Sequence, residues 1–433
     1  MNYSETVHYL FSSLPVFQHS GGTAYKPGLH TMRELDDFYG QPHRKYATIH
    51  IAGTNGKGSV AHMLAAILQG SGYTTGLFTS PHLTDFRERI RVNGEMITER
   101  ETVDFVERSR AMWEKVQPSF FEATAAMAFD HFARRGADVA VIETGMGGRL
   151  DATNIITPAL SVITNISMDH TQFLGNHPIA IATEKAGIIK PGVPVVIGES
   201  QPGAETVFEN AARSMDCHIV FADRHASVSR IIPCGKGQKC YIRQNGRELP
   251  VPVTIDMGGD YQRRNIITTL IAVQAMRFHA SIPLKGDRIL PSLEHAAQTT
   301  GLRGRWQVLC DRPLTVCDAA HNSAGLAWAV EQIGRCARRR VHIVIGFVRD
   351  KDIAGMLALL PGTASYYFTR AAIPRAMDER ELQQRAQEAG LRGECYPQVA
   401  QAMEAARSKA EDEDMIFIGG SIFVIAEALN NEA

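Results

Sequence analysis

The chain has 433 residues, of which 44% are hydrophobic and 21% charged, and its formal net charge is -1 at pH 7. This length exceeds one ordinary hydrophobic core, so we expect two domains and allow three. The near-zero charge gives no whole-molecule field for nucleic acid or anionic lipid, and no apolar run reaches the ~20 residues of a membrane span.

The seven cysteines include no C-x-x-C pair, which argues against a disulfide framework and for a reducing compartment. Residues 1–11, "MNYSETVHYLF", lack the basic and apolar regions of a signal peptide. We therefore expect a cytoplasmic protein with neither nucleic acid nor membrane among its partners.

Short β-branched runs alternate with helical patterns from about residue 46 onward. A strand at 46–53 ("YATIHIAG") precedes a helix at 60–72, and further strands are expected at 74–80, 137–145, 159–166 and 193–200. This alternation predicts a mostly parallel sheet with helices on both faces. Asn-Gly pairs within 89–97 and 240–251 predict two hairpins, the second in a small β patch at about 219–256.

A glycine-rich polar stretch, "QTTGLRGR", follows a helical segment that ends near His295. We place the linker there, at 298–305, between a first domain at 1–297 and a second at 306–433. In the second domain strands at 306–310, 313–320, 341–347, 364–369 and 414–420 alternate with helices, two of them consecutive before the last strand. The predicted fold is α/β: a P-loop domain with a mostly parallel sheet and a small β patch, then a smaller Rossmann-like domain.

The stretch "HIAGTNGKGSV" places Gly53, Gly56 and Gly58 between a predicted strand and a predicted helix. Missing side chains let backbone N–H groups close on an anion there. Lys57 would put a positive charge at the β- and γ-phosphates, and Ser59 offers a hydroxyl to Mg²⁺. Gly58 intervenes between lysine and hydroxyl, so the match to the P-loop motif is imperfect, and a plain glycine-rich turn is the alternative.

Oxygen and nitrogen ligands for a divalent cation follow the next predicted strands. Ser80, Glu143 and the pair Asp169–His170 each lie just after a strand. Because the carboxyl ends of parallel strands share one edge of a sheet, these side chains are expected beside the glycine loop. A helix cap or a solvated group is the alternative for each one alone, but their recurrence predicts a Mg-ATP site.

Eight sequence blocks, in this order, resemble the folylpolyglutamate synthase and dihydrofolate synthase family of the Mur ligase superfamily. They run from residue 53 to the C-terminal region: "GTNGKGS", "TSPHL…RERI", "IETGMGGRLDATN", "MDHTQFLG", "TEKAGIIKPG", "DAAHN", "GFVRDKD" and "IGGSIFVIAEA". The resemblance implies a first domain like the central domain of Mur ligases. The peptidoglycan relatives carry an extra N-terminal domain, for which the position of Gly53 leaves no room, so a folate acceptor is expected.

The resemblance also implies the site residues. The expected ATP-binding residues are Gly53, Thr54, Asn55, Gly56, Lys57, Gly58, Ser59, Val60, Asn265, Arg305, Asp318 and His321. The expected ligands of two Mg²⁺ ions are Ser59, Ser80, Glu143, His170 and an N-carboxylated Lys185, for which a plain lysine that pairs with Glu184 or binds phosphate is the alternative. The expected folate-binding residues are Gly28, Leu29, His30, Ser119, Phe120, Phe121, Glu122, Leu150, Asp151 and Ala152. Phe120 and Phe121 have a core role as their alternative.

The implied reaction joins a folate or dihydropteroate carboxylate to L-glutamate through an acyl phosphate, with ADP and phosphate released. Lys57, His170 and Lys185 are the expected catalytic residues, and closure of a hinge at 298–305 would exclude water. We expect a monomer with both synthase activities. A P-loop small-molecule kinase, another Mur-type amino-acid ligase and a non-enzymatic nucleotide switch are the alternatives; the kinase and the switch leave the blocks of the second domain unexplained.

Overall fold

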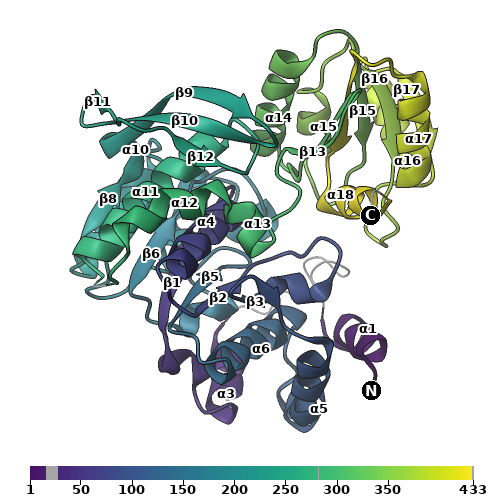
Figure 1. Ribbon diagram of the computed structural model, residues 1–433. Coiled ribbons are helices and arrows are strands. Elements are labelled where there is room, and N and C mark those ends of the chain that lie inside the picture. The colour runs from purple at the N-terminus through teal and green to yellow at the C-terminus, as the bar shows by residue number, and fades with distance from the viewer. Residues whose placement is uncertain (16–27, 281, 432–433) are drawn as a thin grey trace. The chain divides into compact units, whose positions relative to one another are not determined.

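The computed structural model describes residues 1–15, 28–280 and 282–431 (Figure 1). The chain divides into two compact units. Unit 1 runs to Leu302, apart from two short segments, Gly235–Gly237 and Met257–Tyr261, which belong to unit 2 together with the chain from Arg303 onward. The division at 302/303 falls within the expected linker, whose first residues, 298–300, are the end of a helix.

In its described residues unit 1 contains an eight-stranded sheet of order β4-β3-β2-β5-β1-β6-β7-β8. The strands are β1 (Ala47–Ala52), β2 (Thr75–Phe78), β3 (Ile90–Val92), β4 (Glu95–Met96), β5 (Val139–Glu143), β6 (Leu160–Ile163), β7 (Val195–Ile197) and β8 (Ile219–Phe221). All neighbours pair in parallel except along β2-β3-β4, which is antiparallel. The mostly parallel sheet predicted from the alternation is confirmed.

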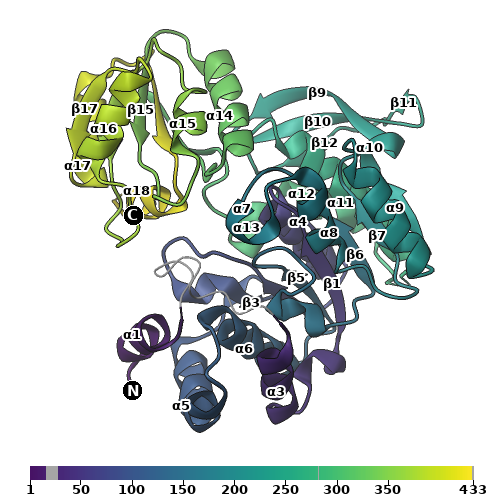
Figure 2. The same ribbon diagram turned by 180° about the vertical axis from the view of Figure 1, so that it is seen from behind.

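Helices cover both faces of this sheet, as Figures 1 and 2 show from opposite sides. The helices of unit 1 are α1 (Tyr3–Ser13), α3 (His30–Phe38), η2 (Pro42–Lys45), α4 (Lys57–Gly70), η3 (Phe86–Arg89), α5 (Glu99–Val116), α6 (Phe120–Arg134), η4 (Ala152–Ile155), α7 (Thr171–Leu174), α8 (Pro178–Ala186), α9 (Ala204–Ser214), α10 (Ala222–His225), α11 (Gln262–Phe278), α12 (Gly286–Glu294) and α13 (Ala296–Thr300). Helix α4 lies between the sheet and α11–α13 and is buried from Ser59 to Leu68. A helix enclosed in this way is apolar on all sides, and here the buried polar exceptions, Ser59 and His62, are hydrogen-bonded.

A separate antiparallel sheet contains β9 (Ala226–Cys234), β10 (Gly237–Gln244), β11 (Arg247–Glu248) and β12 (Val253–Ile255). Asn245 and Gly246 have φ of 50° and 78°, which is the left-handed pair that an Asn-Gly hairpin turn needs. Both predicted hairpins are confirmed. The predicted start of the patch at 219 is wrong, because β8 pairs in parallel with β7 and so belongs to the main sheet.

In its described residues unit 2 has a six-stranded sheet of order β13-β14-β18-β15-β16-β17. The strands are β13 (Gln307–Asp311), β14 (Leu314–Cys317), β15 (Val341–Ile345), β16 (Ser365–Thr369), β17 (Gly393–Tyr396) and β18 (Met415–Gly419); the helices are α14 (Ser323–Cys336), α15 (Ile353–Leu357), α16 (Glu379–Glu388), α17 (Val399–Lys409) and α18 (Ile422–Asn431). The pairs are parallel except β13–β14, so the predicted α/β class of this unit is confirmed. Strand β17 was not predicted.

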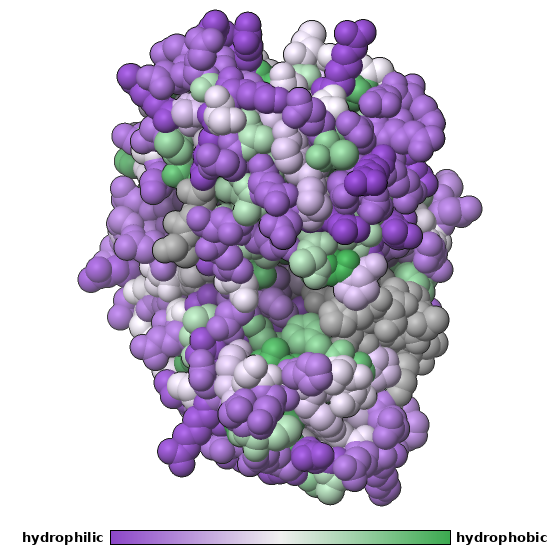
Figure 3. Space-filling model, turned by 90° about the vertical axis from the view of Figure 1, so that its right-hand side faces the viewer, coloured by the Kyte–Doolittle hydropathy of each residue, from purple (hydrophilic) through white to green (hydrophobic). Residues whose placement is uncertain are grey.

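Hydrophilic residues dominate the face in Figure 3, with hydrophobic residues in scattered groups. Within the described ranges, no helix combines the length and the apolar character that crossing a membrane requires. The seven cysteines are all free thiols.

Candidate active site

The glycine loop connects β1 to α4, and its conformation excludes side chains at two positions. Gly53 and Gly56 have φ of 147° and 87°. A Cβ atom would lie 1.8 Å from Oγ1 of Thr164 at Gly53, and 2.2 Å from Oδ1 of Asn265 at Gly56. Helix α4 begins at Lys57, so the loop leads into a helix N-terminus, where free N–H groups and the helix dipole favour an anion.

Substitution of Gly53 by Ala is expected to destabilise unit 1 by about 3 kcal/mol, since the new methyl group meets Thr164 in a backbone conformation that alanine rarely adopts. Thermal or urea unfolding measures the change. Gly136→Ala is the matched control, because Gly136 also has positive φ but open space around it. Equal loss of stability in both variants would contradict the steric account.

Hydrogen bonds from the end of β6 shape the loop. The N–H groups of Thr54 and Asn55 donate to the backbone O (2.9 Å) and Oδ1 (3.0 Å) of Asn165. The hydroxyl of Thr54 donates to the carbonyl of Ser167 (3.1 Å). Because these loop donors are engaged by the protein, they fix the path of the loop.

Lys57, Ser80 and Glu143 meet at the carboxyl edge of the sheet. Lys57 Nζ donates to the carbonyls of Gly53 (3.1 Å) and Thr54 (3.2 Å) and lies 3.9 Å from Oε1 of Glu143. The other oxygen of Glu143 accepts from the N–H of Ser80 (3.1 Å). The buried carboxylate of Glu143 is thus held beside the ammonium of Lys57 and the backbone of Ser80. The sequence predicts metal ligands at this edge, where the parallel strands end.

Ser59 lies in the first turn of α4, next to α11. Its Oγ accepts from Nε2 of Gln262 (3.2 Å), whose Oε1 accepts from Nδ2 of Asn265 (2.7 Å). Two expected ATP-binding residues, Ser59 and Asn265, are therefore linked through Gln262, while Gly58 and Val60 belong to the helix itself.

Lys185 is buried near the end of α8, and its Nζ donates to the carbonyl of Gly53 (2.7 Å). Burial, reinforced by the charge of Lys57, lowers its pKa to about 7, against the opposing pull of Asp169 and Asp151. Glu184, the alternative partner considered from sequence, pairs instead with Arg149 (2.7 Å). The side chain therefore joins the glycine loop, and its amine is readily neutral near physiological pH.

His170 immediately precedes α7, with φ of 51°. Its N–H donates to Oδ1 of Asp169 (2.8 Å), and the charge of Asp169 acts on Lys185. This segment therefore approaches the site from the end of β6.

The donor set suits Mg²⁺ bound together with phosphate. Within residues 1–15, 28–280 and 282–431, no three His, Cys, Asp or Glu side chains cluster as a metal site. Ser59, Ser80 and Glu143 offer two hydroxyls and one carboxylate, which are hard oxygen donors but too few for a protein-only cage. Mg²⁺ is commonly held by one or two carboxylates plus phosphate oxygens, so the residues fit a nucleotide-bound ion.

Asp318 follows β14 in unit 2 and is fully engaged by its own unit. Its Oδ2 accepts from the hydroxyl of Tyr261 (2.6 Å) and the N–H of Trp306 (2.7 Å), and its Oδ1 accepts from Ala320 N (2.9 Å). Burial raises the pKa of this carboxyl, and the charge of Arg305 partly offsets the rise. Asp318 thus organises the loop that carries Arg305.

The neighbouring residues of unit 2 have contacts within their own loops. Arg305 Nη1 donates to the carbonyl of Gly304 (3.2 Å), and Nδ1 of His321 lies 2.9 Å from the carbonyl of Ala319. Arg305 and His321 lie on two stretches of unit 2, before β13 and after β14, which the hydrogen bond from Ala319 N to the carbonyl of Gly304 (3.0 Å) joins. Their role at ATP stays a prediction.

Residues 119–122, expected at the folate, begin helix α6. Ser119 and Glu122 form a capping box, with Ser119 N and Oγ donating to Glu122 Oε2 (2.7 and 2.8 Å). Phe120 belongs to the hydrophobic core, 4.8 Å from the ring of Phe11. Phe121 is half-buried, and a Cβ on Gly145, two residues after Glu143, would lie 2.5 Å from its ring. The ring of Phe121 therefore lies against the loop that follows β5.

The other expected folate segments have different surroundings. Gly28 (φ 122°) and Leu29 precede α3, and His30 is 87% exposed, with Nε2 3.2 Å from Oε1 of Glu34. Leu150 is half-buried and Ala152 buried. Asp151 caps η4 with both oxygens engaged by Met146 N (2.9 Å), Thr153 N (3.0 Å) and Thr153 Oγ1 (2.5 Å).

Arg89 lies in the sequence block "RERI" but is not among the expected site residues. It is buried, donates from Nε to Nδ1 of His82 (2.7 Å), and lies 5.1 Å above the ring of Phe120. Burial lowers its pKa to about 10, and the charge of Glu143 acts against this. Gln262 and Asn165 were also missed. The sequence does not show that these side chains are buried. A charged run such as "RERI", or a single Gln or Asn, is equally compatible with a side chain in solvent.

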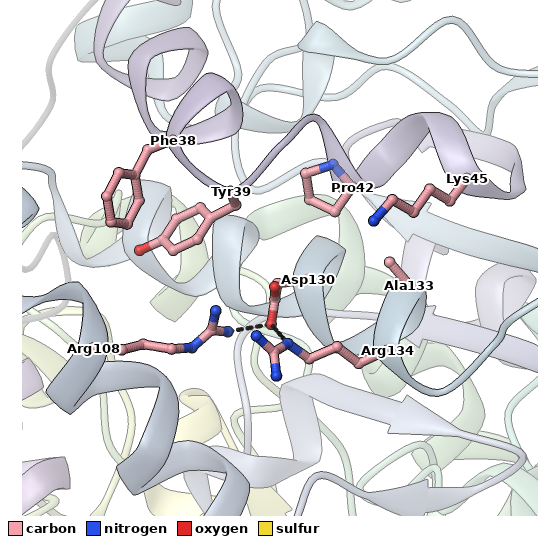
Figure 4. A pocket seen from close by; sticks show the side chains of 8 residues that line it. All are labelled: Phe38, Tyr39, Pro42, Lys45, Arg108, Asp130, Ala133 and Arg134. Carbon is pink, nitrogen blue, oxygen red and sulfur yellow. Dashed lines mark hydrogen bonds and ion pairs between the residues drawn. The ribbon is translucent and has the colours of Figure 1, made fainter.

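A pocket of about 370 Å³ lies among α3, η2, α5 and α6 (Figure 4). It is lined by Phe38, Tyr39, Pro42, Lys45, Arg108, Asp130, Ala133 and Arg134. Arg108 and Arg134 both pair with the carboxylate of Asp130. Helix η2 precedes β1, whereas the glycine loop follows it, so this pocket is at the opposite edge of the sheet and contains none of the expected site residues.

Two protein-family models match the chain: the Mur ligase middle domain at 51–273 and the Mur ligase glutamate ligase domain at 304–422. A folylpolyglutamate synthase of Lacticaseibacillus casei is 34% identical over 98% of this chain and 97% of its own length. A probable bifunctional folylpolyglutamate synthase/dihydropteroate synthase of Haloferax volcanii is 34% identical over 99% of this chain, which spans 50% of that protein. The bifunctional folylpolyglutamate synthase/dihydrofolate synthase of Yersinia pestis, solved with Mn, AMPPNP and L-glutamate, has a TM-score of 0.84 at 27% identity, covering 100% of this chain and 98% of that one.

Proposed function

The chain belongs to the folylpolyglutamate synthase and dihydrofolate synthase family of the Mur ligase superfamily, and we propose that it joins L-glutamate to a folate carboxylate with cleavage of ATP. It is an ADP-forming acid–amino-acid ligase. The observation that carries this proposal is the meeting of Lys57, Ser80 and Glu143 at the glycine loop, in a chain that matches such synthases along its whole length.

The reaction needs activation of the acceptor carboxylate, whose leaving group would otherwise be oxide. A carboxylate oxygen attacks the γ-phosphorus of ATP, the bond to ADP breaks, and an acyl phosphate forms. The neutral amine of glutamate then attacks the carbonyl carbon, the tetrahedral species expels phosphate, and the amine loses a proton as the amide forms. Glutamate thus reacts only after phosphoryl transfer.

Lys57 is the protein cation of the first step. Its ammonium, held over the loop by Gly53 and Thr54, opposes the negative charge of the γ-phosphate oxygens while the carboxylate and the phosphorus are aligned. The donors at the N-terminus of α4 bind the remaining phosphate oxygens. Positioning and charge neutralisation therefore account for most of the catalysis.

The proposed metal ligands are Ser59, Ser80 and Glu143 for one Mg²⁺ and His170 with carboxylated Lys185 for a second. When bound, Mg²⁺ supplies positive charge that offsets the charge on the phosphate oxygens. Carboxylation of Lys185 is supported by its burial and lowered pKa, because only a neutral amine reacts with CO₂. Asn265, Arg305, Asp318 and His321 remain proposed ATP contacts on the basis of the resemblance.

The proposed folate contacts follow the same resemblance. They are Gly28, Leu29, His30, Ser119, Phe120, Phe121, Glu122, Leu150, Asp151 and Ala152. Phe121 has the best structural support, because its ring lies against the loop that follows Glu143.

We expect the purified protein to incorporate labelled glutamate with Mg-ATP when either dihydropteroate or tetrahydrofolate is supplied. Activity with both acceptors identifies a bifunctional synthase, and activity with one identifies a single synthase. ADP release that is fast without glutamate and leaves phosphate on the acceptor would identify a kinase and contradict the ligase. A cytoplasmic monomer completes the proposal.

A further inference from the structure

A histidine occupies the middle of β1, where its neighbours in the strand are apolar. His50 is completely buried and lies between Ile49 and Ile51, which are also completely buried. Its side chain points to the same sheet face as Ala52, which belongs to the core under α8 and α9. An imidazole in such a position must satisfy its polar atoms internally or incur a desolvation cost.

Hydrogen-bond accounting fixes the state of His50. The hydroxyl of Thr153 lies 2.5 Å from Oδ1 of Asp151. Burial raises the pKa of this carboxyl, but its two oxygens accept from the N–H groups of Met146 and Thr153, which favours the ionised form. An ionised carboxylate only accepts, so the hydroxyl donates its single proton there. The same hydroxyl lies 2.8 Å from Nε2 of His50 and must therefore accept from it. His50 is neutral and carries its proton on Nε2, which agrees with burial lowering its pKa to about 3.

The other ring nitrogen has no partner. Nδ1 of His50 is buried without a hydrogen bond to any described residue. An unsatisfied buried acceptor costs about 1–3 kcal/mol, which an apolar residue of similar size would avoid. Stability alone therefore favours leucine over histidine at this position.

The chain His50–Thr153–Asp151 ends on the loop between Glu143 and η4. Oδ2 of Asp151 accepts from Met146 N at 2.9 Å, three residues after Glu143. The same loop packs on the end of α8: Arg149 N donates to the carbonyl of Glu184 (2.7 Å). The loop 144–149 thus connects Glu143, which is proposed to hold Mg²⁺, with α8, the helix that carries Lys185.

Glycine makes this contact possible. A Cβ on Gly148 would lie 2.9 Å from the carbonyl oxygen of Glu184 and 3.0 Å from that of Lys185. The backbone of the loop therefore rests directly on the turn of α8 that carries Lys185, and a shift of Asp151 would be transmitted to both sides of the site.

We infer that His50 is a positioning residue, which through Thr153 and Asp151 fixes the loop 144–149 and hence the relative placement of Glu143 and Lys185. His50 contacts no reacting atom. Because β1 also leads into Gly53, the same strand positions the glycine loop and, through His50, the loop 144–149. The expected effect of His50 on turnover rests on the proposed function. Its expected effect on the structure of the loop 144–149 does not.

The structural consequence is tested first by amide hydrogen exchange at Met146. His50→Leu removes the donor to Thr153, and we expect exchange at Met146 to accelerate about 10-fold or more. His50→Gln, whose amide can donate to the same hydroxyl, retains slow exchange. Unchanged exchange in His50→Leu would overturn the inference whether or not the protein is a ligase.

The kinetic consequence is a fall in kcat of about 10- to 100-fold in His50→Leu, as for residues that orient a metal site. KM for ATP and glutamate stays within about 3-fold, and the melting temperature is equal or higher, since the orphaned Nδ1 is removed. His50→Gln restores most of kcat. Thr153→Val behaves like His50→Leu, Thr153→Ser like the wild type, and the double variant is no slower than either single.

Val139→Ala is the matched control. Val139 is buried at the start of β5, at the opposite end of the strand from Glu143. We expect this variant to melt earlier without loss of kcat at temperatures where it is folded. If His50→Leu keeps the full kcat, or if its loss simply tracks melting temperature as in Val139→Ala, the positioning role is wrong. If wild-type protein has no glutamate-dependent turnover, the proposed function fails while the exchange experiment still decides the inference.

Discussion

Lys57→Ala is expected to reduce kcat about 10³-fold, to the edge of detection, while the protein remains folded. Lys57 is the cation held over the glycine loop by two backbone carbonyls, 3.9 Å from Glu143. Its loss leaves the charge of the transferring phosphoryl group without its protein counter-charge. Steady-state release of ADP, with glutamate and acceptor saturating, measures the effect.

Lys45→Ala is the matched control for this substitution. Lys45 is an exposed lysine in η2, before β1 begins, whereas Lys57 follows the end of that strand. Its removal should leave kcat within about 2-fold of the wild type, as for surface changes remote from a site. Turnover in Lys57→Ala comparable to that in Lys45→Ala would remove the glycine loop from the mechanism.

Lys185→Ala is expected to lose activity about 10²- to 10³-fold and to recover part of it with added formate or acetate. The substitution opens a small buried space beside the carbonyl of Gly53, where a short carboxylate can stand in for a carbamate. Assays across a series of carboxylate concentrations measure the recovery. Lys190→Ala, which removes another partly buried lysine of unit 1, should show no such response.

The chemistry of the rescue distinguishes the two roles of Lys185. Methylamine would replace a plain lysine, whereas a carboxylate would replace a carbamate. Rescue by methylamine alone, or full activity of Lys185→Ala with no additive, would contradict carboxylation.

The pH dependence follows from the lowered pKa of Lys185. Its pKa is about 7 instead of 10.5, so the reactive neutral amine becomes dominant as pH rises through about 7. We therefore expect bicarbonate-dependent activation of the unmodified protein to increase over that interval. The same shift means that the unfolded state binds more protons between pH 7 and 10.5, so the unmodified protein gains stability as pH rises across that range. Lys185→Met should lose this slope.

Local patterns were enough to predict much of unit 1. The strands ending at Ala52 and Glu143 are short β-branched runs, and the pairs Asn93-Gly94 and Asn245-Gly246 favour hairpin turns wherever they occur. The meeting of Ser80, Glu143 and Lys57 follows from the parallel sheet alone, because its carboxyl ends share one edge.

Features that depend on distant partners could not be predicted in this way. Strand β17, "GECY", is a short, half-buried edge strand with no apolar alternation, and only pairing with β16 makes it a strand. Asp318 is bound by Tyr261, 57 residues away in sequence, and Arg89 is buried because Phe120 and His82 surround it.

One local signal in the sequence predicts a structural role for two of the expected folate residues. Ser119 and Glu122 have the S-x-x-E spacing of a capping box, and the structure shows this box at the start of α6. The resemblance implies a folate contact for the same two residues, which stays a prediction. Their hydrogen bonds to each other give them a structural role that local helix chemistry predicts by itself.

The most direct test of the mechanism uses an acceptor with ¹⁸O at both oxygens of its reacting carboxylate. If the carboxylate attacks the γ-phosphorus and an acyl phosphate is broken by glutamate, each phosphate released carries one ¹⁸O, and mass spectrometry of the phosphate detects it. We expect one labelled oxygen per phosphate, formed only when glutamate is present. Phosphate without label, or label that stays in a phosphorylated acceptor, would contradict the account.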